Sequence, residues 1–241
     1  FLESGNEFSY AWWGDQYGKG DWSGYHWHFE EHGALKITQV ENDVIKGVIE
    51  GHGKREDNYR SDDYTFYGTF TYFLSNNTLI EHFATNYKDN VKIESRYSQG
   101  PWFYLGTNTS TASIMNNTFK NIGTRIISVH YVPIRTYVYY RSDSNASYYE
   151  DNIVFYGRLT EKYCFDVRSK VLVYYELAYY DMWNSYQYAG WDYKEYFKLT
   201  TISVGLSVAV QDNMRSLYYI VVVLLSMIVV LLSFLLIVLS I

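Results

Sequence analysis

The chain contains little cysteine, proline or charge. It has one Cys and two Pro among 241 residues, and charged residues make up 19% of it. A single cysteine excludes an intramolecular disulfide, so the fold must be held by its core. Cys164 lies in the strand-like run YCFDV, and we expect it to be a small buried apolar residue. The net charge of −6 offers no electrostatic basis for binding nucleic acid.

The recognised catalytic motifs are also missing. The sequence has no G-x-S-x-G elbow, no P-loop and no dinucleotide fingerprint, and no activating base stands near Cys164. Adjacent acids occur at Glu30–Glu31, Asp62–Asp63 and Glu150–Asp151, but neighbours on a strand point to opposite faces, and glycoside hydrolysis needs two carboxylates across a cleft. We interpret these pairs as solvated loop charges. The sequence favours a non-catalytic protein with no cofactor.

Aromatic residues are abundant instead. Twenty-eight Tyr, 13 Phe and 7 Trp make the chain 20% aromatic. This much apolar surface drives collapse into a packed core, and Tyr and Phe favour strands. Between about 35 and 200, apolar runs of eight to eleven residues alternate with short turns. The pattern predicts an all-β domain with sequential antiparallel pairing, either a sandwich or a barrel.

Turn chemistry and composition divide the chain into three parts. An N-terminal segment, 1–33, is rich in Trp and Gly, and we expect mostly loop there, with a short strand near Tyr25–Phe29, packed on the β-domain. The β-domain follows over 34–211, and a helix over 212–241. Within the β-domain we predict turns at 41–43, 75–77, 88–90 and 168–169, and later strands at 124–140, 152–160, 162–167, 170–180 and 201–210.

The C-terminal segment 217–241 predicts a membrane span. It contains no charged residue, no Gly and no Pro. A helix of this length spans roughly 37 Å, enough to cross a ~30 Å hydrocarbon core. The chain begins at Phe1 and not at Met, as a cleaved secretory signal would leave it. We therefore expect a single-pass protein in a lipid bilayer, with its N-terminal domain extracellular.

Small residues recur along the predicted span, at Ser226, Ser233 and Ser240. A stripe of this kind lets a second transmembrane helix approach closely, which predicts a homo-oligomer or a complex with other membrane or envelope subunits. Alternatively, each hydroxyl bonds the carbonyl one turn back. Four N-x-S/T triplets in turn-like stretches predict glycosylation and an exterior location, at Asn76, Asn108, Asn116 and Asn145.

Two further groups of side chains could bind ligands. His26 and His28 project from one face of a strand and could hold Zn or Cu, with His32, Glu30 or His52 as a third ligand. The alternative, which their Trp neighbours favour, is a packed aromatic cluster. Exposed aromatic rings could stack on sugars; alternatively, the rings form the core or are buried at subunit contacts, and contacts are favoured over sugar binding. The rings concerned are Trp12, Trp13, Trp22, Trp27, Trp183 and Trp191.

Abundant Tyr, sequons in loops, one Cys and the apolar tail at 217–241 make the chain similar to secreted, membrane-anchored surface proteins of thermoacidophilic archaea and their viruses. The resemblance is compositional and carries no site residues. It implies a structural or assembly role at a cell surface or virion envelope. Two alternatives stay open: a domain that binds carbohydrate or another ligand, and an accessory subunit of a membrane enzyme complex.

Overall fold

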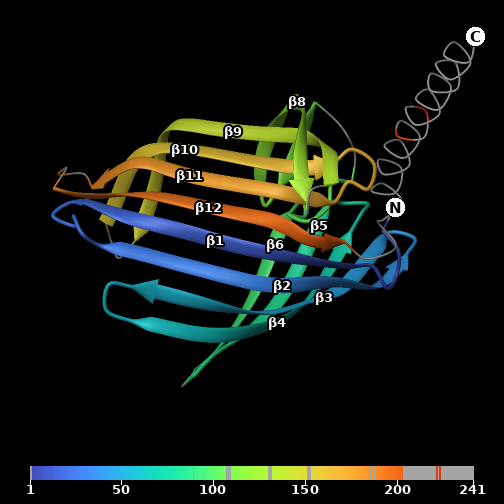
Figure 1. Ribbon diagram of the computed structural model, residues 1–241, viewed down its shortest axis with the longest axis horizontal. Coiled ribbons are helices and arrows are strands. Elements are labelled where there is room, and N and C mark those ends of the chain that lie inside the picture. Colours follow the sequence, from blue (N-terminus) through green and yellow to red (C-terminus); the bar gives the residue numbers. More distant parts are fainter. Residues whose placement is uncertain are drawn as a thin grey trace, which may run out of the picture.

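The protein is all-β in the computed structural model, which describes residues 2–88, 90–106, 110–129, 132–150, 153–184, 186, 188–202, 221 and 223. Twelve strands form one antiparallel sheet (Figure 1). The strands are β1 (Glu7–Gly20), β2 (His26–Glu41), β3 (Val44–Asp57), β4 (Ser61–Phe73), β5 (Thr78–Tyr87), β6 (Asn90–Gln99), β7 (Thr111–Ile114), β8 (Asn117–Val129), β9 (Val132–Glu150), β10 (Ile153–Asp166), β11 (Leu172–Asn184) and β12 (Ala189–Ile202). The predicted all-β class and the antiparallel pairing are confirmed for the described residues.

The sheet runs in the order β6-β5-β4-β3-β2-β1-β12-β11-β10-β9-β8-β7. Neighbours in the sheet are also neighbours in sequence except at one seam, where β1 pairs with β12. This seam lies in the middle of the sheet. The first described strand is therefore fully paired, with β2 on one side and β12 on the other.

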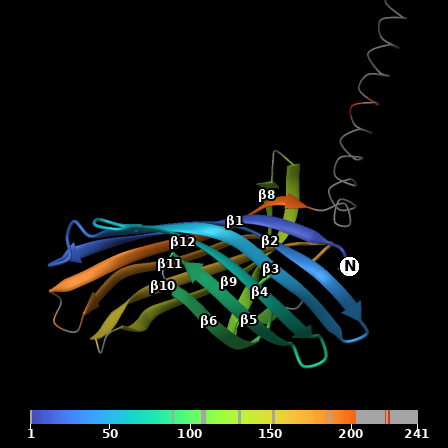
Figure 2. The same cartoon turned by 90° about the horizontal axis from the view of Figure 1, so that it is seen from below.

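The sheet curves so that its two halves share one core. In Figure 2, β4–β6 cross in front of β9 and β10. One cluster of buried side chains includes Ile49 and Leu79 from one half and Phe119 and Phe165 from the other. The two edges meet at one end, where the backbone N–H of Asn116 donates to the carbonyl of Gln99 at 2.9 Å. The described residues thus form a single continuous sheet around an interior.

Glycine and aromatic residues face each other across neighbouring strands of the β1–β5 half. At each such glycine, a Cβ would come within 2.4 to 2.7 Å of the opposing aromatic side chain. The ring can cover the strand only because the glycine has no side chain, and such close approach is a known use of glycine in strands. The pairs are Gly14–Phe29, Gly33–Tyr10, Gly47–Phe70, Gly51–Phe66, Gly53–Tyr64 and Gly68–Phe83.

This pairing corrects the prediction for 1–33. The glycines there indicated loop with one short strand, whereas Glu7–Gly20 is a 14-residue strand at the centre of the sheet. Two other strand predictions also need correction. Ile153–Asp166 is one strand and not two, and the predicted strand at 124–140 is divided between β8 and β9.

The four predicted turns fall between strands as expected. At the first of them, Asn42 adopts a positive φ of 37°, which Asn tolerates better than most residues. The predicted final strand at 201–210 overlaps the structure only at Thr201 and Ile202, which end β12. The rest of that strand lies outside the described residues.

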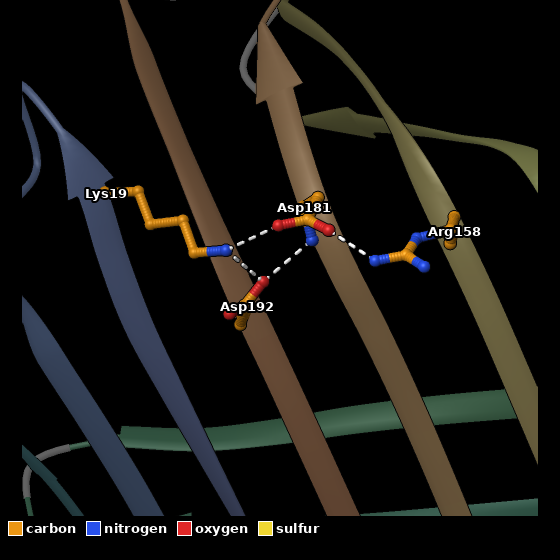
Figure 3. A network of polar contacts seen from close by, with 4 residues as sticks. All are labelled: Lys19, Arg158, Asp181 and Asp192. Carbon is orange, nitrogen blue, oxygen red and sulfur yellow. Dashed lines mark hydrogen bonds and ion pairs between the residues drawn. The ribbon is translucent and has the colours of Figure 1, made fainter.

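Irregularity in β11 is accompanied by an ionic network. The register of β11 shifts against β12 between Tyr179 and Met182, and Asp181 within the shift has φ +52°. Its carboxylate accepts from Lys19 Nζ at 2.9 Å and pairs with Arg158 Nη2 at 2.5 Å, while Lys19 also reaches Asp192 at 2.7 Å (Figure 3). The network joins β1, β12, β11 and β10 at one end of the sheet.

The residues predicted to span the membrane, 217–241, fall almost entirely outside the described part of the chain, as do Ser226, Ser233, Ser240 and the sequon at Asn108. Within the described residues, no helix has the length and apolar character needed to cross a bilayer.

Candidate functional site: the interior cavity

A cavity of about 520 Å³ lies inside the curved sheet. Its wall is predominantly aromatic, and both halves of the sheet contribute to it. The aromatic side chains in the wall are Tyr10, Trp12, Trp27, Phe29, Tyr64, Phe66, Phe83, Tyr87, Trp102, Tyr163, Tyr175, Tyr193 and Phe197.

Strand β6 marks the mouth of the cavity. Lys92, Glu94 and Arg96 line the cavity, yet their side chains keep 61%, 31% and 53% of their surface exposed to solvent. Both cations pair with Glu94, at 2.5 Å from Lys92 and 3.1 Å from Arg96. The mouth therefore carries a small charged cluster, while the wall behind it is aromatic.

Strand alternation brings the other lining residues inward. Trp27, Phe29 and Glu31 are two apart on β2 and all line the cavity, as do Tyr193, Glu195 and Phe197 on β12. Residues two apart share one face of a strand. Glu30, by contrast, is exposed, so the two acids point to opposite faces as predicted. Our interpretation of this pair as solvated loop charges is wrong for Glu31, which lies on a strand and faces the cavity.

Four glutamates of the cavity wall are largely removed from water: Glu31, Glu81, Glu161 and Glu195. Each accepts a hydrogen bond from an aromatic donor. Tyr64 O–H donates to Glu31, Trp102 Nε1–H to Glu81 at 2.9 Å, Tyr163 O–H to Glu161 at 3.2 Å, and Tyr193 O–H to Glu195. Burial raises the pKa of all four carboxyls, because it penalises their charged form.

Glu195 has the most perturbed titration of the four. Burial first, and then the charges of Glu31 and Glu161, raise its pKa to about 7, although the donors Tyr193 and Trp12 favour its charged form. The Trp12 Nε1–H is itself buried and makes no full hydrogen bond to any described atom. Glu195 therefore exchanges its proton near neutral pH, and the indole N–H beside it reaches no described acceptor with full hydrogen-bond geometry.

Few cations reach these acids. Arg55 lies over the Tyr64 ring, 4.8 Å from its centroid, and donates to the Tyr87 hydroxyl at 2.9 Å. Its charge, with that of Arg96, lowers the pKa of Glu31 against the larger effect of burial. Arg141 Nη1 lies 3.8 Å from Glu161. The arrangement can accept hydrogen bonds and compensate a positive charge on a bound molecule.

The histidines are arranged differently from a metal site. His26 Nε2 and His28 Nδ1 lie 3.2 and 3.0 Å from the same carboxylate oxygen of Asp15, so they do share one face. His32 is not brought to them; it pairs with Glu30 at 2.9 Å and stacks on His52. In the described part of the chain, no three or more His, Cys, Asp or Glu side chains are placed to hold a metal ion.

The three described sequon asparagines are all exposed. Asn76 lies in the β4–β5 turn and Asn116 in the β7–β8 turn. Asn145 lies within β9 and not in a turn, which corrects that prediction. Cys164 is fully buried as predicted, and burial raises the pKa of its thiol to about 11.

The tryptophans predicted to bind sugars or form contacts lie in different parts of the structure. Trp12 and Trp27 line the cavity, Trp13 stacks on Tyr196, and Trp191 packs with Phe155 in a second, smaller core cluster. Sequence reasoning missed the four interior glutamates and Trp102. One signal was available: W-x-F-x-E at 27–31 and Y-x-E-x-F at 193–197 place an acid among aromatic residues on one strand face.

Comparison of the chain with protein families, with curated proteins and with solved structures finds no match in any of the three.

Proposed function

We propose that the protein binds a small organic molecule in its interior cavity. The observation that carries this proposal is the convergence of aromatic rings and largely buried carboxylates on one cavity of about 520 Å³. Ligand pockets are typically concave, mostly apolar, of roughly 300–1,000 Å³, and hold a few placed polar groups. A core built only for stability would be filled to close packing.

We further propose that this domain is displayed on the outer side of a membrane. The apolar segment 217–241 supports anchoring, and the exposed asparagines Asn76, Asn116 and Asn145 support an exterior location. The protein would then capture its ligand from the medium outside.

A matched pair of variants tests cavity binding. Thr85→Trp places a large ring in the cavity wall, whereas Thr69→Trp makes the same change on an exposed site of β4. The purified full chain is titrated with neutral sugars, amines, carboxylates and lipids, and binding is followed by tryptophan fluorescence and thermal shift. We expect one class to bind, with binding lost in Thr85→Trp and kept in Thr69→Trp. No response to any class would overturn the proposal.

A structural role in lateral assembly is a second candidate, supported by strand β6. This strand pairs only with β5 along most of its length, and its outward residues Val91, Ile93 and Tyr97 are 56%, 79% and 63% exposed. An exposed apolar edge strand is a template for pairing with another chain. Two-fold antiparallel pairing centred on Ile93 would set Lys92 opposite Glu94 of a second copy.

Native mass measurement tests this assembly. Ile93→Lys should shift the protein to a lower oligomeric state, because it places two like charges together at the two-fold axis. Ile126→Lys, at another highly exposed position, on β8 (64%), is the control and should leave the mass unchanged. A monomer at all concentrations before mutation, or no change in Ile93→Lys, would argue against edge pairing.

A further inference from the structure

The inner part of the cavity has more acids than cations. Four glutamates line it besides Glu94, and the only cation among the described lining residues outside β6 is Arg55, which is itself exposed. The mouth cations already pair with Glu94. Carboxylates that are largely removed from water favour their protonated form unless a positive charge compensates them.

Glu195 differs from the other three glutamates because no cation is among the groups that act on its pKa. The groups that act on it are two further carboxylates, a tyrosine hydroxyl and an indole N–H. The charged and titratable groups facing it come from β1, β2, β10, β11 and β12: Trp12, Glu31, Glu161, Tyr163, Tyr175 and Tyr193. None of these is a cation, and among the described residues Glu195 makes no ion pair, so only hydrogen-bond donors stabilise its charged form.

Aromatic rings line the cavity together with this acid. Trp27 lies 6.3 Å from Tyr193, and Trp12 lies 6.0 Å from Phe29, measured between ring centroids. Rings of this kind attract a desolvated cation over their faces. A carboxylate bordered by indole and phenol rings offers an ammonium group both a counter-charge and a stabilising wall.

Trp12 adds a second observation. Its Nε1–H is buried and reaches no acceptor with full hydrogen-bond geometry, which is costly unless an acceptor comes closer. A ligand oxygen beside the cationic group would satisfy this donor. The donor and Glu195 are close neighbours, since the Trp12 N–H favours the charged form of Glu195.

We propose that the cavity binds an organic cation that also carries a hydroxyl or carbonyl oxygen, with its ammonium group at Glu195 and its oxygen at Trp12. This inference rests on the ligand-binding role proposed above and names the class of ligand. A neutral sugar would use the aromatic walls equally well but would leave the acids uncompensated.

Proton release distinguishes cation binding from neutral binding. A cation favours the ionised carboxylates, so its affinity rises with pH as Glu195 loses its proton near pH 7. Below that pH, each binding event must displace a proton. Titration calorimetry in two buffers of different ionisation enthalpy measures that proton directly.

The experiment uses two pairs of probes that match in shape and differ in charge. Choline is compared with 3,3-dimethylbutan-1-ol, and glucosamine with glucose, on the full chain in detergent at pH 5 and pH 8. We expect at least one cation to bind tenfold or more tightly than its neutral partner at pH 8. The preference should shrink at pH 5, with proton release on binding.

Glu195→Gln should lower the cation's affinity at pH 8 about tenfold and leave the neutral partner's affinity unchanged. Glu30→Gln, on the opposite face of β2, is the control. Glu161→Gln serves as a second variant if the first does not fold. Neutral probes that bind as tightly as the cations would overturn the inference and leave the cavity-binding function standing. No binding by any probe class would overturn both.

Discussion

A carboxyl group buried among rings makes stability depend on pH. The pKa of Glu195 is about 7 in the folded protein and 4.5 ordinarily. Between these values the folded state binds more protons than the unfolded state, so the free energy of unfolding falls as pH rises through this window. Burial of the charged form costs up to about 3 kcal/mol above it.

Glu195→Gln removes this cost while keeping the shape of the side chain. We expect the variant to gain about 1–3 kcal/mol in free energy of unfolding at pH 8 and almost nothing at pH 4. Urea denaturation at the two pH values measures the difference. Equal gains at both would show that ionisation of Glu195 is not the cause.

A second feature of individual residues is the close contact between an aromatic side chain and a glycine on the neighbouring strand. In Gly14→Ala, the new Cβ would lie 2.4 Å from a carbon of Phe29. Overpacking of this kind costs about 1–3 kcal/mol. We expect Phe29→Leu in the same chain to recover part of that loss, which a double-mutant cycle measures.

Gly106→Ala provides the comparison, because its nearest atom is the Tyr72 hydroxyl at 3.3 Å. It should change the free energy of unfolding by about 0.5 kcal/mol or less. Strictly additive losses for Gly14→Ala and Phe29→Leu would contradict direct contact as the reason for this glycine.

Among the elements, strand β11 depends on a residue in the left-handed region. Asp181 combines φ +52° with ion pairs to Lys19 and Arg158. Asp181→Ala loses both pairs and places Ala at a positive φ, so we expect a loss of roughly 1–3 kcal/mol. Asp181→Asn tolerates the backbone conformation and should lose less than about 1 kcal/mol.

Thermal or urea denaturation checks this order. Asp62→Ala breaks a single exposed pair with Arg60 at a position of ordinary φ, and it should cost at most about 1 kcal/mol. If Asp181→Ala and Asp62→Ala cost the same, the left-handed conformation contributes nothing measurable.

The elements also show what the sequence could and could not predict. Asn42 and Ser169 marked turns correctly, because turn chemistry is local. Gly14 and Gly33 were misleading, because a glycine within a strand resembles a loop residue in the sequence until the aromatic ring opposite it is known. The inward direction of Glu31 depends on which face of β2 meets the other half of the sheet. That is a property of the whole sheet and cannot be read from neighbouring residues.

At the scale of the whole molecule, the seam between β1 and β12 joins residues almost the full described length apart, such as Tyr10 and Leu199. Non-local pairing slows folding, because loop-closure entropy is lost before contacts compensate it. We expect refolding on the scale of a second or slower, with the seam forming late and the hairpins early.

Two buried leucines test this order of events. Leu199→Ala at the seam should mainly speed unfolding, whereas Leu79→Ala in the β4–β5 hairpin should slow folding. Stopped-flow measurements over a range of denaturant concentrations separate the two rates. The reverse pattern would mean that the seam forms first.

The same seam has a consequence for the protein while it is being synthesised. Strand β1 emerges first, yet one of its edges stays open until Ala189 and the residues after it have been made. At roughly 5–20 residues per second this wait lasts about ten to thirty seconds. Throughout it, a nascent chain rich in tyrosine and tryptophan exposes an unpaired edge, so its production in cells should depend on chaperones that shield that edge.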